Sequence, residues 1–286
     1  MMSAEMLVRF WGVRGGIPCP GADTVVYGGN TSCVELRCGE RTIIFDAGSG
    51  IRKLGRHLLA EGRRLDLDLI ISHCHVDHLI GLPFFAPVFR TDAVIRLWTG
   101  HRDSRECLHD AVAQLMKPPL FPITPETFAA NLAYRDFMAG DAMDMGHGIT
   151  LSTAALNHPG GATGYRIDFD GRSFGYFTDH EHGPDGSDPA VVALARELDL
   201  LVLDASYTPE EYGVCRGWGH STWSEAAALA DAAGVRQLAL FHHDPSHDDA
   251  AMARIEADAR LRRPATFVAR EDQVVTLERA VIPPAA

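Results

Sequence analysis

Histidine and aspartate residues come at the ends of apolar, strand-like runs at four separate places in this chain. The run LDLDLIIS leads into the hexapeptide HCHVDH at residues 73–78, and three later runs end at His158, Asp179 and His242. Loops that follow strands carry a large share of binding and catalytic residues. The recurrence of the same arrangement indicates that these side chains act together in one site.

The chemistry of HCHVDH favours metal binding. In an extended stretch, His73 and His75 point to the same side, so both can reach one cation. Asp77 and His78 follow a change of direction and can reach a second ion. Imidazole and carboxylate ligands of this kind suit Zn²⁺ best, with Mn²⁺ or Fe²⁺ as alternatives. Cys74, between these residues, is expected to pack away from the metal.

Strand-like and helix-like segments alternate along the chain, which indicates an α/β fold. We expect strands over 7–13, 65–73, 93–100, 149–156, 163–170, 172–179, 200–206 and 235–243. We expect helices over 51–62, 104–116, 189–198, from the capping box at Thr222 to Ala233, and from Ser246 to Arg260. This order fits a four-layer αβ/βα sandwich forming a single domain over residues 1–286. A doubly wound parallel sheet is the alternative.

Charge and composition restrict the function. Lys and Arg total 26 and Asp and Glu total 38, so the formal net charge is −12, and the mean field repels phosphate backbones and anionic lipid. We expect no membrane helix, because no apolar run approaches about 18 residues. The six cysteines show no CxxC spacing and the first residues show no signal peptide, so we expect a cytoplasmic protein.

Together, HCHVDH, His158, Asp179, His242 and the loop DAGSG at 46–50 resemble the ligand series of the metallo-β-lactamase-fold hydrolases. The resemblance spans residues 7 to about 247. The acidic fourth position and the sequence GHST at 219–222, ahead of an Ala-rich helix, are similar to the phosphodiesterase branch. That branch includes ribonuclease Z and small cyclic-phosphate esterases.

The resemblance implies an αβ/βα sandwich with two divalent metal ions. It assigns His73, His75 and His158 to the first ion, and Asp77, His78 and His242 to the second, with Asp179 bridging both. His243 is the rival of His242, which we prefer because it directly follows LALF. Asp46 and Asp204 either orient ligand imidazoles or form turns, and both readings stay open.

The resemblance also implies a reaction. We expect a hydroxide that bridges the metals to attack phosphorus, with Asp77 orienting it or taking its proton. His220 is the candidate for stabilising the transition-state charge and protonating the leaving oxygen. The alternative for His220 is a loop histidine that only bonds to backbone.

The expected substrate is a small phosphodiester, such as a cyclic nucleotide or a cyclic phosphate. Ribonuclease Z-type enzymes hold tRNA with a protruding basic arm, whereas residues 101–146 are proline-rich without a Lys/Arg cluster, so long nucleic acid is disfavoured. RNA 3′-processing and lactone or thioester hydrolysis are the alternatives, and a homodimer is left open. A non-catalytic metal-binding scaffold is disfavoured because all seven ligands are present. Candidate pocket residues are Tyr27, Asn30, Thr31, Trp218 and Trp223.

Overall fold

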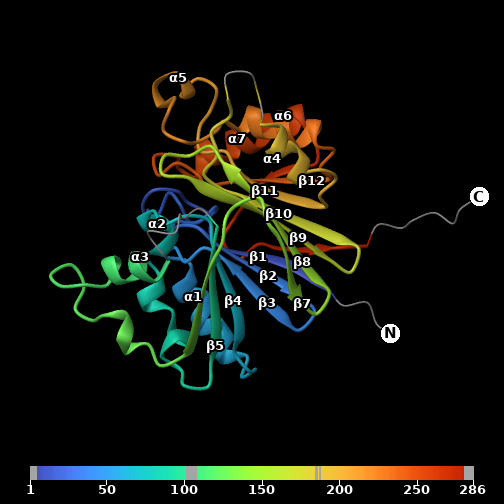
Figure 1. Cartoon of the computed structure of the whole chain (residues 1–286). Coiled ribbons are helices and arrows are strands. Elements are labelled where there is room, and N and C mark those ends of the chain that lie inside the picture. Colours follow the sequence, from blue (N-terminus) through green and yellow to red (C-terminus); the bar gives the residue numbers. More distant parts are fainter. Residues whose placement is uncertain (1–4, 101–107, 184–185, 187, 280–286) are drawn as a thin grey trace, which may run out of the picture.

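Two seven-stranded sheets pack face to face in the computed structural model, which describes residues 5–100, 108–183, 186 and 188–279 (Figure 1). The first sheet has the order β14 (Val274–Leu277), β1 (Met6–Gly12), β2 (Cys33–Cys38), β3 (Arg41–Phe45), β4 (Asp66–Ile71), β5 (Val94–Thr99) and β6 (Asn131–Asp136). The second has the order β13 (Thr266–Val268), β12 (Gln237–Phe241), β11 (Leu200–Asp204), β10 (Arg172–Phe177), β9 (Ala162–Phe169), β8 (Ile149–Leu156) and β7 (Ala142–Gly146).

Helices cover the outer face of each sheet. On the first sheet lie α1 (Ile51–Ala60) and α3 (Leu108–Leu115), and on the second lie α4 (Pro189–Leu194), α6 (Trp223–Ala232) and α7 (Asp249–Arg262) (Figure 1). Two short helices, α2 (Val76–Leu79) and α5 (Tyr212–Cys215), lie in connecting segments. Single 3₁₀ turns span Leu82–Phe84, Ala86–Phe89 and Pro125–Thr127.

Three separate apolar cores match the three spaces between four layers. The central core joins the sheets, with Phe10 and Phe45 from the first and Tyr165 and Phe174 from the second. A second core lies between α4, α6, α7 and the second sheet, and a third between α1, α3 and the first. The predicted αβ/βα sandwich is therefore confirmed, and a single doubly wound sheet is excluded.

The structure corrects the sequence-based elements in four places. The helix expected over 189–198 is α4, which ends at Leu194. The segment 101–146 contains two strands that the periodicity did not indicate, β6 and β7, both at sheet edges where polar side chains face solvent. The helix expected over 104–116 is described only as α3, because residues 101–107 lie outside the described residues. Asp248, not Ser246, is the N-cap of α7, because Ser246 donates to the carboxylate of Asp244 in the preceding turn.

Among the described residues, no helix combines the length and the apolar character needed to cross a bilayer.

Two buried tyrosines of the second sheet donate hydrogen bonds to the first. The Tyr176 hydroxyl lies 2.8 Å from Oδ2 of Asp46, and the Tyr165 hydroxyl lies 2.8 Å from the carbonyl oxygen of Ile71. Both side chains are fully buried. The two bonds differ in their acceptor, which is a carboxylate for Tyr176 and a neutral carbonyl for Tyr165.

Tyr176→Phe is expected to lower the free energy of unfolding by about 1.5–3 kcal/mol, and Tyr165→Phe by about 0.5–1.5 kcal/mol, because hydrogen bonds to charged acceptors are stronger. Urea unfolding of chelator-treated protein would measure both. Equal losses, or a larger loss for Tyr165→Phe, would contradict the inference that the Asp46 bond is the stronger tie between the sheets.

Candidate metal centre

The predicted site residues all lie at one edge of the two sheets. The hexapeptide His73–His78 follows β4, His158 follows β8, Asp179 follows β10, and His242 follows β12. Strands β10, β11 and β12 are parallel neighbours, so their carboxyl ends meet at the same edge. Ligands in open α/β sheets commonly bind at this position.

His73, His75 and His158 form the first group, with one ligand atom of each within 4.8 Å of the others. Nε2 of His158 lies 3.0 Å from Nδ1 of His75. Nδ1 of His158 lies 2.9 Å from the carbonyl oxygen of Gly219, which can only accept, so Nδ1 carries the proton. The lone pair of Nε2 is therefore left facing the group.

Asp77, His78 and His242 form the second group. Oδ2 of Asp77 lies 3.1 Å from Nε2 of His78 and 3.2 Å from Nε2 of His242. His78 donates from Nδ1 to Oδ2 of Asp46 at 2.8 Å, which again leaves Nε2 facing the group.

Asp179 lies between the two groups. Its Oδ2 atom is 3.6 Å from Nε2 of both His73 and His158. Its Oδ1 atom is 3.3 Å from Nε2 of His78 and 3.2 Å from Nε2 of His242. One carboxylate thus presents one oxygen to each group.

His243 is turned away from this cluster. Its Nε2 atom donates to the carbonyl oxygen of Ala269 at 2.9 Å, and the side chain is fully buried. Burial lowers the pKa of His243 to about 3, so the imidazole is neutral. Of the two adjacent histidines, the structure therefore brings His242 into the site.

Two buried carboxylates hold the imidazoles from outside the cluster. Asp46 accepts from Nδ1 of His78 and also from Ser72 and Tyr176. Asp204 accepts from Nδ1 of His220 at 2.7 Å and lies 3.6 Å from Nδ1 of His242. Both aspartates contact histidines of the site, and Asp204 also accepts from the Ser206 amide two residues on, so for Asp204 both interpretations hold.

The backbone adopts a left-handed conformation at three non-glycine residues of the site. The φ angles are 60° at Asp46, 57° at Asp179 and 62° at His242. Such angles are uncommon outside glycine and concentrate at functional sites. They aim side chains that a regular strand end would direct elsewhere.

Sequence reasoning missed the glycine pair at 15–16. The amide of Gly16 donates to Oδ2 of Asp77 at 2.8 Å. A Cβ atom on Gly15 would lie 2.3 Å from Cε1 of His242, so the ring packs directly on the glycine backbone. The only available signal was the density of glycine in this loop, which does not reveal what the loop contacts.

The donor set fits divalent cations. Nε2 of His78 is buried and makes no hydrogen bond within the described part of the chain. Burial lowers the pKa values of His75 and His158, which keeps them in the neutral form that binds metal. Burial alone would raise the pKa of Asp179, but the adjacent His242 and His78 hold that pKa well below its usual range.

His220 lies beside both groups. Its ring stacks on His242 with centroids 4.9 Å apart and meets His158 edge-on at 5.2 Å. Burial alone would lower the pKa of His220, but the charge of Asp204 and its hydrogen bond raise that pKa to about 9. Because Asp204 engages Nδ1, Nε2 is the nitrogen left for a substrate.

A pocket of about 610 Å³ opens beside His158. Its lining includes Glu181, His182, Tyr212 and Arg216. The expected pocket residues do not line it. Tyr27 donates a hydrogen bond to Glu256, and Asn30 donates one to Glu271. Thr31 is fully buried, Trp223 packs on the second core, and Trp218 is exposed to solvent.

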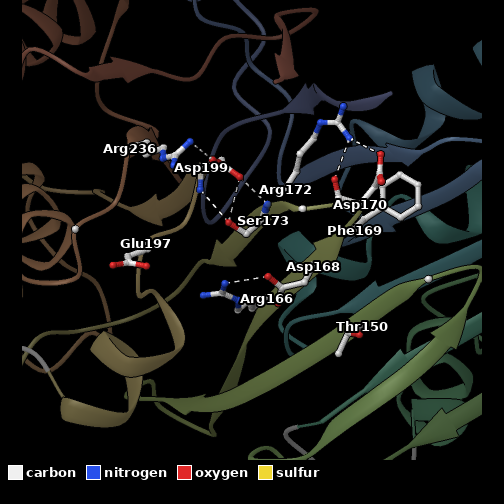
Figure 2. Close-up of a pocket in the computed structure, with 13 residues that line it drawn as sticks. Thr150, Arg166, Asp168, Phe169, Asp170, Arg172, Ser173, Glu197, Asp199 and Arg236 are labelled. Carbon is white, nitrogen blue, oxygen red and sulfur yellow. Dashed lines mark hydrogen bonds and ion pairs between the residues drawn. The ribbon is translucent and has the colours of Figure 1, made fainter. Parts of the chain in front are cut away.

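A larger pocket of about 710 Å³ lies at the opposite end of the second sheet (Figure 2). It is lined where β10 begins and by residues that precede β11 and β12. Its arginines are each paired with a carboxylate of the same pocket, Arg166 with Asp168, Arg172 with Asp170 and Arg236 with Asp199 (Figure 2). This pocket holds none of the candidate site residues.

The fold and the histidine–aspartate cluster define a metallo-β-lactamase-fold protein of the metal-dependent hydrolase class. The model of the beta-lactamase superfamily domain matches residues 41–243, and the chain belongs to this family.

Relatives and solved structures agree with this assignment. A ribonuclease Z from Bradyrhizobium sp. (strain ORS 278) is 29% identical over 289 residues, covering 85% of this chain and 92% of that protein. The metallo-beta-lactamase fold protein YhfI from Bacillus subtilis has a TM-score of 0.71 at 19% identity, covering 95% of this chain and 99% of that one. A diphosphatase of the PhnP family has a TM-score of 0.67 at 17% identity, and the match covers 96% of this chain and 99% of that one.

Gly15→Ala is expected to weaken binding of a divalent metal by about 10–100-fold, because the new methyl group displaces the ring of His242. Zinc titration against a chromophoric chelator would measure the affinity. Gly213→Ala is the matched control, because nothing lies within 4 Å of a Cβ atom built there. Wild-type affinity in Gly15→Ala would show that the ring does not depend on this glycine.

Proposed function

We propose that this protein is a phosphodiesterase that uses two divalent metal ions, with zinc preferred. In this proposal His73, His75 and His158 hold the first ion, and Asp77, His78 and His242 hold the second. Asp179 serves both. The observation that carries the proposal is the position of its two oxygens, one within 3.6 Å of Nε2 of His73 and His158 and the other within 3.3 Å of Nε2 of His78 and His242.

A pair of divalent ions would supply a lowered pKa for water and charge stabilisation on a phosphoryl oxygen. The residues of the chain provide the proton transfers. Asp77, fixed by the Gly16 amide, is placed to orient the attacking water and take its proton. His220, held at Nδ1 by Asp204, would donate from Nε2 to the leaving oxygen.

We propose a small phosphodiester as the substrate. The net charge of −12 disfavours a long polyanion. The pocket beside His158 has a volume of about 610 Å³. Among the described residues that line it, Arg216 is the one Lys or Arg. A pocket of this size suits a mononucleotide-sized group.

RNA 3′-processing is the second candidate, favoured by a relative named ribonuclease Z at 29% identity over 85% of this chain. Lactone or thioester hydrolysis is the third, because water activated by two metals also attacks carbonyl carbon.

His220→Ala is expected to lower kcat by about 10²–10⁴-fold without loss of metal, because only the proton donor is removed. Turnover of bis(p-nitrophenyl) phosphate and elemental analysis would be measured on the same preparation. His109→Ala, at an exposed histidine of α3, is the control. Near-normal turnover with full metal content would remove His220 from the mechanism.

The substrate class can be tested directly. We expect hydrolysis of bis(p-nitrophenyl) phosphate and of a 2′,3′- or 3′,5′-cyclic nucleotide, with weaker activity on a lactone, a thioester and a precursor tRNA. Comparison of kcat/KM over this panel is the measurement. A dominant value for precursor tRNA would favour RNA processing, and one for the lactone or thioester would favour carbonyl chemistry.

A further inference from the structure

Glu181 lies two residues after Asp179 and is 7% exposed. Its carboxylate accepts three hydrogen bonds from one loop. Oε1 accepts from the Tyr212 hydroxyl at 2.8 Å and from the Gly217 amide at 2.7 Å, and Oε2 accepts from the Gly219 amide at 2.9 Å. Glu181 makes no ion pair with any Lys or Arg of the described chain, so these three donors are its main partners.

The same loop holds the imidazole of His158. The Gly219 carbonyl accepts from Nδ1 of His158 at 2.9 Å, while the Gly219 amide donates to Glu181. Gly219 has a φ of +88°, and a Cβ atom there would lie 2.2 Å from Nδ1 of His158, so the contact requires glycine. Glu181 and His158 are therefore joined through one glycine residue.

The backbone of Glu181 also holds the segment that carries His158. The Glu181 amide donates to the Asn157 carbonyl at 2.9 Å, and Nδ2 of Asn157 donates to the Glu181 carbonyl at 2.9 Å. His158 is thus held by Glu181 on two sides, at its own chain segment and at its ring.

We infer that Glu181 is a positioning residue of the metal centre, which sets the orientation of His158 and the position of His220. The inference rests on the proposed function. A carboxylate can accept from both glycine amides at once, and the loop then presents the Gly219 carbonyl to His158 and places His220 against Asp204. An amide side chain has one acceptor oxygen and one NH₂ group, so it would face one glycine amide with a donor.

Glu181 supports one of the two proposed metal sites and not the other. His158 belongs to the first group, whereas Asp77, His78 and His242 of the second group have no hydrogen bond to Glu181 among the described residues. Loss of the carboxylate therefore acts on one ion and leaves the other in place. A residue that only stabilised the fold would weaken both.

The test compares Glu181→Gln with Tyr212→Phe, which removes one bond to the same carboxylate and leaves the Gly219 bond intact. Stepwise zinc affinities would be measured on metal-free protein by competition with a chromophoric chelator. We expect Glu181→Gln to weaken one of the two zinc ions by about 10–100-fold, and Tyr212→Phe to stay within about twofold of wild type. The absorption spectrum of cobalt-loaded Glu181→Gln should change for one ion only.

The thermal midpoint of the metal-free variants separates positioning from folding. We expect Glu181→Gln and Tyr212→Phe to have similar midpoints. Unchanged affinity for both ions in Glu181→Gln, or an equal loss for both with a lower midpoint, would overturn the inference. If wild-type protein bound no pair of ions, the proposed function itself would fail, which is a distinct result.

Discussion

The two histidine-containing groups of the site meet at the carboxylate of Asp179. It comes from the end of β10, in the second sheet, and meets His73 and His78 from the loop after β4, in the first sheet. The two sheets must therefore pack in one relative position for the two groups to share it. The central apolar core and the bonds from Tyr165 and Tyr176 hold that position.

Charge balance gives a physical reason for a pair of cations. Five carboxylates at the site are at least nine-tenths buried: Asp46, Asp77, Asp179, Glu181 and Asp204. Buried charge is costly unless it is compensated. Five ionised carboxylates carry −5, His220 with its raised pKa carries +1 and two divalent cations would carry +4, so the proposed centre sums to zero. Asp46 also keeps the proton of His78 on Nδ1, the nitrogen that faces away from the proposed metal position.

The members of the cluster could be predicted from the sequence alone, because each follows an apolar run that reads as a strand. The carboxyl ends of neighbouring parallel strands lie at one edge of a sheet. His242 could be preferred to His243 from its position directly after LALF, and the structure brings His242 into the cluster. The roles of Asp46 and Asp204 could not be decided, because a turn aspartate and an orienting aspartate look alike in sequence. The left-handed backbone at Asp46, Asp179 and His242 gave no signal, because its cause is tertiary. Gly16 contacts Asp77, and Glu181 contacts loop amides that are also distant in sequence. Periodicity and motif spacing do not reveal contacts of this kind.

Anomalous diffraction at the zinc edge, on crystals of the metal-loaded protein, would locate any metal ions relative to Asp179. We expect two strong peaks, one on each side of the Asp179 carboxylate, the first among His73, His75 and His158 and the second among Asp77, His78 and His242. A single peak, or peaks away from Asp179, would contradict this expectation.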